Sequence, residues 1–98
     1  MVCNADANSA CEPIAVPTIL LVEDFDQLRN LSVRLLTDSG YRVIEARNGV
    51  EALACFESHQ ADIHLLVTDL RMPEMNGLDL VAQIRQRRSR LPVLLLSG

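Results

Sequence analysis

Four short strand-like runs, separated by segments with helical spacing, constrain the fold of this chain more than any other feature of its sequence. The runs cover residues 18–22, 41–46, 64–68 and 92–96. The first is continuously apolar, which is typical of a strand buried on both faces of a parallel sheet. Strands that alternate with helices join through right-handed crossovers, which place helices on both sheet faces. The sequence therefore predicts an α/β fold, a doubly wound parallel sheet with the order (βα)₃β.

The three segments between these runs carry apolar residues at helical spacing. The first predicted helix ends at Gly40, and the second begins with Asn48 as its cap and Glu51 as the capping-box partner. Apolar residues three, four or seven positions apart share one face of a helix, which we expect to face the sheet. These residues are Leu28, Leu31 and Leu35 in the first helix, Val50, Leu53 and Ala54 in the second, and Leu78, Val81 and Ile84 in the third.

Residues 1–17 differ from the rest of the sequence. They show no sustained periodicity and combine small polar residues with two prolines. We interpret residues 1–17 as a flexible leader or linker and residues 18–98 as a single domain.

Composition and charge exclude several classes of function. Thirteen acidic residues against nine basic ones give a formal charge of −4, which argues against direct nucleic-acid binding, because phosphate backbones require a clustered positive field. We interpret the one basic cluster, residues 85–90, as a solvated helix C-terminus. Cys3, Cys11 and Cys55 form no metal or disulfide pattern, and no apolar stretch is long enough for a bilayer span. The sequence predicts a soluble, cytoplasmic protein that does not enter a membrane.

Acidic residues follow two of the predicted strands. Glu23 and Asp24 come directly after the first, Asp69 comes after the third, and Ser97 follows the fourth. Ligands of open parallel sheets bind outside the carboxyl ends of the strands, at the switch in strand order. Carboxylates brought together there raise one another's pKa, and a hard divalent cation relieves the repulsion. We therefore predict a magnesium site with room for phosphate oxygens.

Each of these residues also has a plain structural interpretation. Asp24 could cap the first helix with Gln27 as its partner, Asp69 could be a turn residue, and Ser97 a polar residue at the chain end. Three acids on two strand ends of one parallel sheet favour the functional interpretation.

Longer stretches resemble a known family. They are residues 20–24 (LLVED), 40–43 (GYRV), 46–53 (ARNGVEAL), 67–77 (VTDLRMPEMNG) and 92–98 (PVLLLSG). From residue 18 to residue 98 the chain resembles the receiver domain of two-component response regulators, which has a flavodoxin-like fold. It is most similar to the receivers attached to hybrid histidine kinases.

The resemblance implies a role for each site residue. Asp69 would be the phosphoacceptor, supplied by the phosphohistidine of a histidine kinase or a histidine phosphotransfer protein. Asp24 would bind Mg²⁺ directly, Glu23 would act through water, and the backbone carbonyl of Arg71 would be a further ligand. The hydroxyl of Ser97 would bind the phosphoryl group and shift on activation. Such a domain promotes its own phosphorylation and is not a conventional enzyme.

Receivers of this family continue through another helix, a fifth strand with a phosphoryl-binding lysine and an aromatic switch residue, and a final helix. The sequence to Gly98 contains none of these. We therefore expect the phosphoryl site of the 98-residue chain to be incomplete. We also expect residues 93–96 to form an apolar edge strand, which favours self-association.

Two other functions remain open. In a haloacid-dehalogenase-type phosphohydrolase, the motif Asp24-Phe25-Asp26 would supply Asp24 as the nucleophile, but Asp69 would have no role. Alternatively, the chain is a non-signalling interaction fragment of a receiver. Magnesium binding would distinguish that fragment from a phosphoacceptor.

Overall fold

The computed structural model describes residues 16–72 and 75–96. The predicted leader, apart from Val16 and Pro17, and Ser97 lie outside the described residues. The helices and strands are β2 (Thr18–Val22), α1 (Asp26–Asp38), β3 (Arg42–Ala46), α2 (Gly49–His59), β4 (Leu65–Asp69), α3 (Gly77–Arg87) and β5 (Val93–Leu96).

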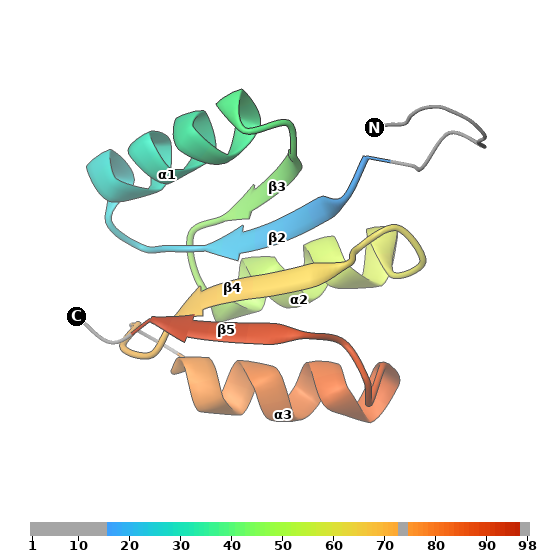
Figure 1. Cartoon of the computed structure of the whole chain (residues 1–98). Coiled ribbons are helices and arrows are strands. Elements are labelled where there is room, and N and C mark those ends of the chain that lie inside the picture. Colours follow the sequence, from blue (N-terminus) through green and yellow to red (C-terminus); the bar gives the residue numbers. More distant parts are fainter. Residues whose placement is uncertain (1–15, 73–74, 97–98) are drawn as a thin grey trace, which may run out of the picture.

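All four strands run parallel in one sheet with the order β3-β2-β4-β5 (Figure 1). The chain moves from β2 outward to β3 and then returns to place β4 on the other side of β2, so the strand order switches between β2 and β4. This arrangement confirms the predicted flavodoxin-like α/β fold, present here as (βα)₃β. None of the described helices is long and apolar enough to cross a membrane.

Alternate residues of β2 belong to two hydrophobic clusters on opposite faces of the sheet. Leu20 packs with Phe56 of α2 and Ile84 of α3 in the larger cluster. Leu21, one position on, packs in the smaller cluster with residues of α1, which include Leu36. Because β2 is covered on both faces, all five of its residues are buried.

The predicted inner face of α1 is wrong. Leu28, Leu31 and Leu35 are exposed, and the exposed fraction of Leu35 reaches 58%. Arg29, Val33 and Leu36 occupy the inward stripe instead, at positions i, i+4 and i+7. Both stripes have helical spacing, and spacing alone does not determine which stripe meets the sheet.

The inner faces of α2 and α3 were predicted only in part. Leu53 and Val81 are half-buried and Ile84 is fully buried, as expected, but Val50, Ala54 and Leu78 are exposed. The fully buried apolar side chains of these helices are Ala52, Phe56, Leu80 and Ile84.

The predicted helix ends agree with the structure. Gly40 has a φ of 98°, and the N–H groups of Gly40 and Tyr41 donate to the carbonyls of Thr37 (3.0 Å) and Leu36 (3.1 Å). This pattern closes the last turn of a helix, and the positive φ favours glycine. At the start of α2, Asn48 Oδ1 accepts the N–H of Glu51 at 2.8 Å.

The arginines near the end of α3 bind neighbouring parts of the fold. Arg87 pairs with Glu57 of α2 at 2.6 Å, and Arg88 donates to the carbonyl of Gln60 at 2.9 Å and also to that of Ile63. These contacts tie α3 to α2 and to the turn before β4.

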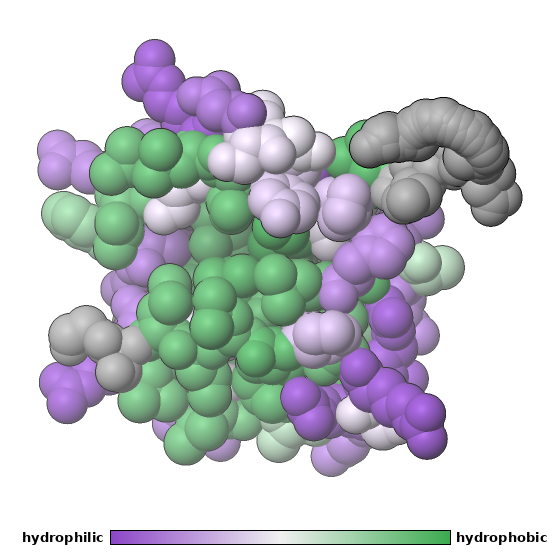
Figure 2. Space-filling model, in the orientation of Figure 1, coloured by the Kyte–Doolittle hydropathy of each residue, from purple (hydrophilic) through white to green (hydrophobic). Residues whose placement is uncertain are grey.

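An apolar groove of about 340 Å³ lies between α1 and β5. Figure 2 shows apolar side chains gathered on this side of the sheet. The groove is lined by Ile19, Leu21, Ser32, Leu35, Leu36, Tyr41, Leu65, Val67, Leu94 and Leu96. Beside it, β5 forms the edge of the sheet, and Leu94, Leu95 and Leu96 are exposed. Exposed apolar edge strands favour pairing with a second chain.

We expect the 98-residue chain to self-associate through β5 and the groove. Leu94→Lys should reduce association, because a charged side chain on an edge strand opposes pairing. Sedimentation velocity over a range of protein concentrations measures this, with Val50→Lys as the control because Val50 is an exposed apolar residue of α2. A wild-type chain that stays monomeric throughout would contradict the expectation.

Candidate functional site

The predicted acids meet at the carboxyl ends of the two central strands. Glu23 and Asp24 directly follow β2, and Asp69 is the last residue of β4. The two strands pair in register, Val22 opposite Thr68, which brings Glu23 level with Asp69. One carboxylate oxygen from each of the three acids lies within 4.8 Å of the others. The structure therefore brings Glu23, Asp24 and Asp69 together as predicted.

The three acids differ in burial. Glu23 is only 4% exposed, Asp69 is half-buried and Asp24 is exposed. Burial raises the pKa of the Glu23 carboxyl, and the hydrogen bond to Asp24 and the charges of Asp69 and Asp24 raise it further. The N–H of Phe25 donates to Glu23 Oε2 at 3.2 Å and acts in the opposite direction. Three carboxylates at this edge therefore repel one another unless a proton or a cation is bound.

The donor set suits magnesium. The three carboxylate oxygens lie within 4.8 Å of one another, a spacing at which they could hold one metal ion. Oxygen-only ligands are also those that hard divalent cations prefer.

The structural interpretation of Asp24 as a helix cap is wrong. The N-cap of α1 is Phe25, and no side chain makes a capping hydrogen bond there. Asp69 does accept the N–H of Arg71, but at 3.4 Å the hydrogen bond is long. Neither aspartate is explained by local turn chemistry alone.

The loop after β4 returns close to Asp69. Arg71 is exposed and lies two residues beyond it. The N–H of Gly77, at the start of α3, donates to the carbonyl of Leu70 at 2.9 Å. A Cβ atom on Gly77 would lie 2.5 Å from the backbone oxygen of Asp69, so only glycine allows this approach. Ser97, the remaining predicted site residue, lies outside the described residues, and the adjoining Leu96 pairs with Asp69 across the sheet.

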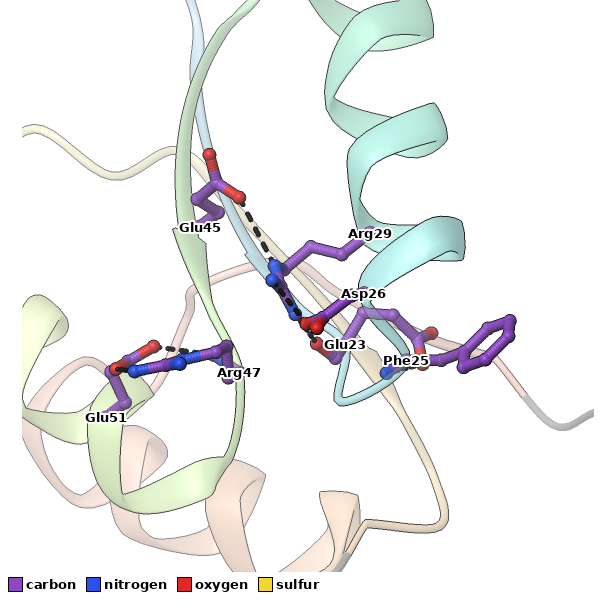
Figure 3. A network of polar contacts seen from close by, with 7 residues as sticks. All are labelled: Glu23, Phe25, Asp26, Arg29, Glu45, Arg47 and Glu51. Atoms are coloured by element: carbon purple, nitrogen blue, oxygen red, sulfur yellow. Dashed lines mark hydrogen bonds and ion pairs between the residues drawn. The ribbon is translucent and has the colours of Figure 1, made fainter.

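Arg29 is a residue of this region that the sequence analysis did not single out. Figure 3 shows its guanidinium between the turn after β2 and the side chain of Glu45 on β3. The sequence did contain a signal for this residue. Arg29 precedes Val33 and Leu36 by four and seven positions, so it is a charged residue on an otherwise apolar helix stripe.

Comparison with known proteins agrees with this geometry. The family described as the response regulator receiver domain matches residues 19–98. The sensor kinase CckA of Brucella abortus is 41% identical over 81 residues, which cover 83% of this chain and 9% of that protein. The chemotaxis protein CheY1 of Helicobacter pylori is 39% identical over 82 residues, covering 81% of this chain and 65% of that protein. This chain thus spans less than two thirds of either relative.

A solved structure extends the agreement to three dimensions. The response regulator protein TrrA of Thermotoga maritima, solved in complex with Mg²⁺-BeF, has a TM-score of 0.78 and 33% identity. The alignment covers 84% of this chain and 70% of that one. The family match does not favour the phosphohydrolase alternative or the non-signalling fragment. The acids lie at the switch in strand order of a parallel sheet, and the family match covers most of the chain. This chain therefore belongs to the response regulator receiver domains, the phosphoacceptor domains of two-component systems.

Proposed function

We propose that Asp69 accepts a phosphoryl group beside a Mg²⁺ ion held by Glu23, Asp24, Asp69 itself and the backbone carbonyl of Arg71. The observation that carries the proposal is the convergence of three carboxylate oxygens within 4.8 Å at the switch in strand order. A phosphoryl group is transferred through a loose transition state, which mainly requires positioning and neutralisation of charge. A magnesium ion would supply that neutralisation.

The donor would be the phosphohistidine of a histidine kinase or a histidine phosphotransfer protein, and the domain would act in the cytoplasm. A carboxylate oxygen of Asp69 attacks phosphorus, the nitrogen–phosphorus bond breaks, and the imidazole nitrogen keeps the electron pair. The product is an acyl phosphate on Asp69. The similarity to a sensor kinase supports a place in a hybrid histidine kinase.

The three acids suit different roles. Glu23 is buried and already accepts the N–H of Phe25, which leaves it poorly placed to attack phosphorus. Asp69 is half-buried at the end of β4, beside the loop that includes Arg71. Ser97 would contribute the phosphoryl-binding hydroxyl and move when Asp69 is phosphorylated. The roles of the three acids follow the pattern of the family and the carboxylate geometry, and the role of Ser97 follows the family pattern alone.

The surroundings of Asp26 do not support the phosphohydrolase alternative, which rests on the spacing of Asp24-Phe25-Asp26. Asp26 is the first residue of α1, and its carboxylate pairs with Arg29 at 2.7 Å. We therefore favour Asp69 over Asp24 as the phosphorylated residue.

Acetyl phosphate with Mg²⁺ should phosphorylate the chain at Asp69 only. Asp69→Asn should abolish incorporation, because an amide oxygen is a poor nucleophile, while Asp62→Asn, which changes an exposed loop residue, should leave it unchanged. Incorporation is measured by intact-protein mass spectrometry, and release by hydroxylamine identifies the acyl phosphate. Full labelling retained in Asp69→Asn would rule out the assignment.

Magnesium should stabilise the folded chain. A ligand that binds only the folded state at ten times its Kd adds about 1.4 kcal/mol to the free energy of unfolding. Asp24→Asn should remove most of this gain and also raise the stability measured without a divalent cation, because it lowers the repulsion among the acids. Thermal melting with and without magnesium measures both effects, again with Asp62→Asn as the control. A melting temperature that does not respond to millimolar magnesium would argue for a non-signalling fragment.

A further inference from the structure

Arg29 occupies a position where an apolar residue would be expected. It begins the inward stripe of α1 that continues with Val33 and Leu36, and the residue is only 9% exposed. Burying a cation is costly unless hydrogen bonds and opposite charges compensate. The aliphatic part of the side chain fits the stripe, but the guanidinium requires partners.

The guanidinium contacts two carboxylate side chains and one backbone carbonyl, which come from three different parts of the fold (Figure 3). Nη2 pairs with Asp26 Oδ1 at 2.7 Å within α1, and Nε pairs with Glu45 Oε1 at 3.2 Å on β3. Nη1 donates to the backbone carbonyl of Glu23 at 3.0 Å. This third contact involves the peptide group that joins Glu23 to Asp24, between two of the three site acids.

Two backbone hydrogen bonds connect the same turn to its surroundings. The N–H of Glu23 donates to the carbonyl of Ala46 at 3.0 Å, and the N–H of Arg29 donates to the carbonyl of Phe25 at 2.9 Å. The first fixes the start of the turn to β3, and the second fixes its end to α1. The guanidinium acts between these points, at the carbonyl of Glu23.

The ion pairs alone do not explain why a cation is buried here. The carboxylate side chains of Asp26 and Glu45 are 73% and 49% exposed. Ion pairs with such solvated partners contribute little to stability, because water screens the charges. Of the three contacts, the hydrogen bond to the Glu23 carbonyl is therefore the one that acts on the backbone of the acidic site.

We propose that Arg29 is a positioning residue for the metal site: it holds the Glu23–Asp24 peptide so that both carboxylates face Asp69 before a cation binds. The inference rests on the proposed function, because it concerns the same three acids. It adds a residue that contacts none of the reacting atoms and acts through the backbone of Glu23.

Whether magnesium binding weakens or tightens when Arg29 is replaced distinguishes positioning from direct charge repulsion. A cation close to the acids repels Mg²⁺, so removing its charge would tighten metal binding if charge were its main influence. If Arg29 acts by positioning, removing it weakens metal binding instead. Loss of partners that orient metal ligands typically lowers metal affinity by about 10- to 100-fold.

The test uses two variants of the 98-residue chain. Arg29→Met keeps an unbranched apolar stem without the charge, and Arg29→Lys keeps the charge without the planar fork that reaches several acceptors at once. Isothermal titration with magnesium chloride should show a Kd about tenfold higher or more in both. In the absence of a divalent cation, the amide of Phe25, which donates to Glu23 Oε2, should exchange with solvent faster in both than in the wild type.

Arg47→Met is the matched control. Arg47 follows β3 and pairs with Glu51 at 3.5 Å (Figure 3). Its side chain is mostly exposed. This variant removes an arginine charge without touching the turn, so neither the Kd nor the exchange of Phe25 should worsen. Circular dichroism melts identify any variant that fails to fold, and the milder Arg29→Lys substitution then carries the comparison.

The outcomes are distinguishable. Weaker magnesium binding and faster Phe25 exchange in folded Arg29 variants support positioning. Binding that is unchanged or tighter overturns it, even if the wild type binds magnesium and is phosphorylated at Asp69. A wild-type chain that binds no magnesium overturns the proposed function and this inference together.

Discussion

The parallel pairing of β2 with β4 is the constraint on which the site depends, because it places the carboxyl ends of two central strands at the same edge of the sheet. Val22 lies opposite Thr68, so the residues that follow, Glu23 and Asp69, meet without any long-range loop. The strand order requires this pairing: the chain leaves β2 for β3 and returns on the other side. Residues 46 positions apart in the sequence thus approach one another through the backbone pairing of the two strands.

The same constraint creates an electrostatic problem for the fold. The buried carboxyl of Glu23 has a raised pKa because of desolvation and the neighbouring acids. Removing the acids would relieve the repulsion and would also remove the donor set. A site that is unfavourable without a cation and stabilised with one couples metal binding to folding free energy.

Arginines around this edge act in two different ways. Arg29 is buried and bonds the turn after β2 through the carbonyl of Glu23, whereas Arg47 is largely exposed and pairs with Glu51 at the start of α2. Solvent screens the second pair, so its contribution to stability is small. The structural effect of each arginine thus depends on its burial and on the atoms it contacts. Its distance from the acids along the chain matters less.

The features that could be predicted from the sequence depend on local chemistry or on the parallel topology that alternating strands and helices imply. The run from Thr18 to Val22, the cap at Asn48 and the glycine at position 40 each follow from neighbouring residues, and the acids at strand ends follow from the parallel topology. The inward stripe of α1 could not be predicted in this way. Leu28 and Arg29 are adjacent, and the sheet selects between their stripes through contacts with β2 and β3 that periodicity does not describe. Arg29 was missed for the same reason.

The close approach of Gly77 could not be predicted for a related reason. Gly77 is the first residue of α3, but its need to lack a Cβ comes from the backbone oxygen of Asp69, eight positions earlier, which would lie 2.5 Å from that atom. A Cβ atom on Gly49 would likewise lie 2.8 Å from the side chain of Met75, in the loop after β4. The two glycines therefore let the loop after β4 pack against both α2 and the end of β4. Asp69, the last residue of that strand, pairs with Leu96 of β5, and both of its neighbours are also held: Thr68 pairs with Val22 of β2, and the carbonyl of Leu70 accepts the N–H of Gly77. The carboxylate then moves mainly through its own side-chain torsions, which suits the nucleophile role proposed for Asp69 because it limits the positions that the reacting oxygen can take.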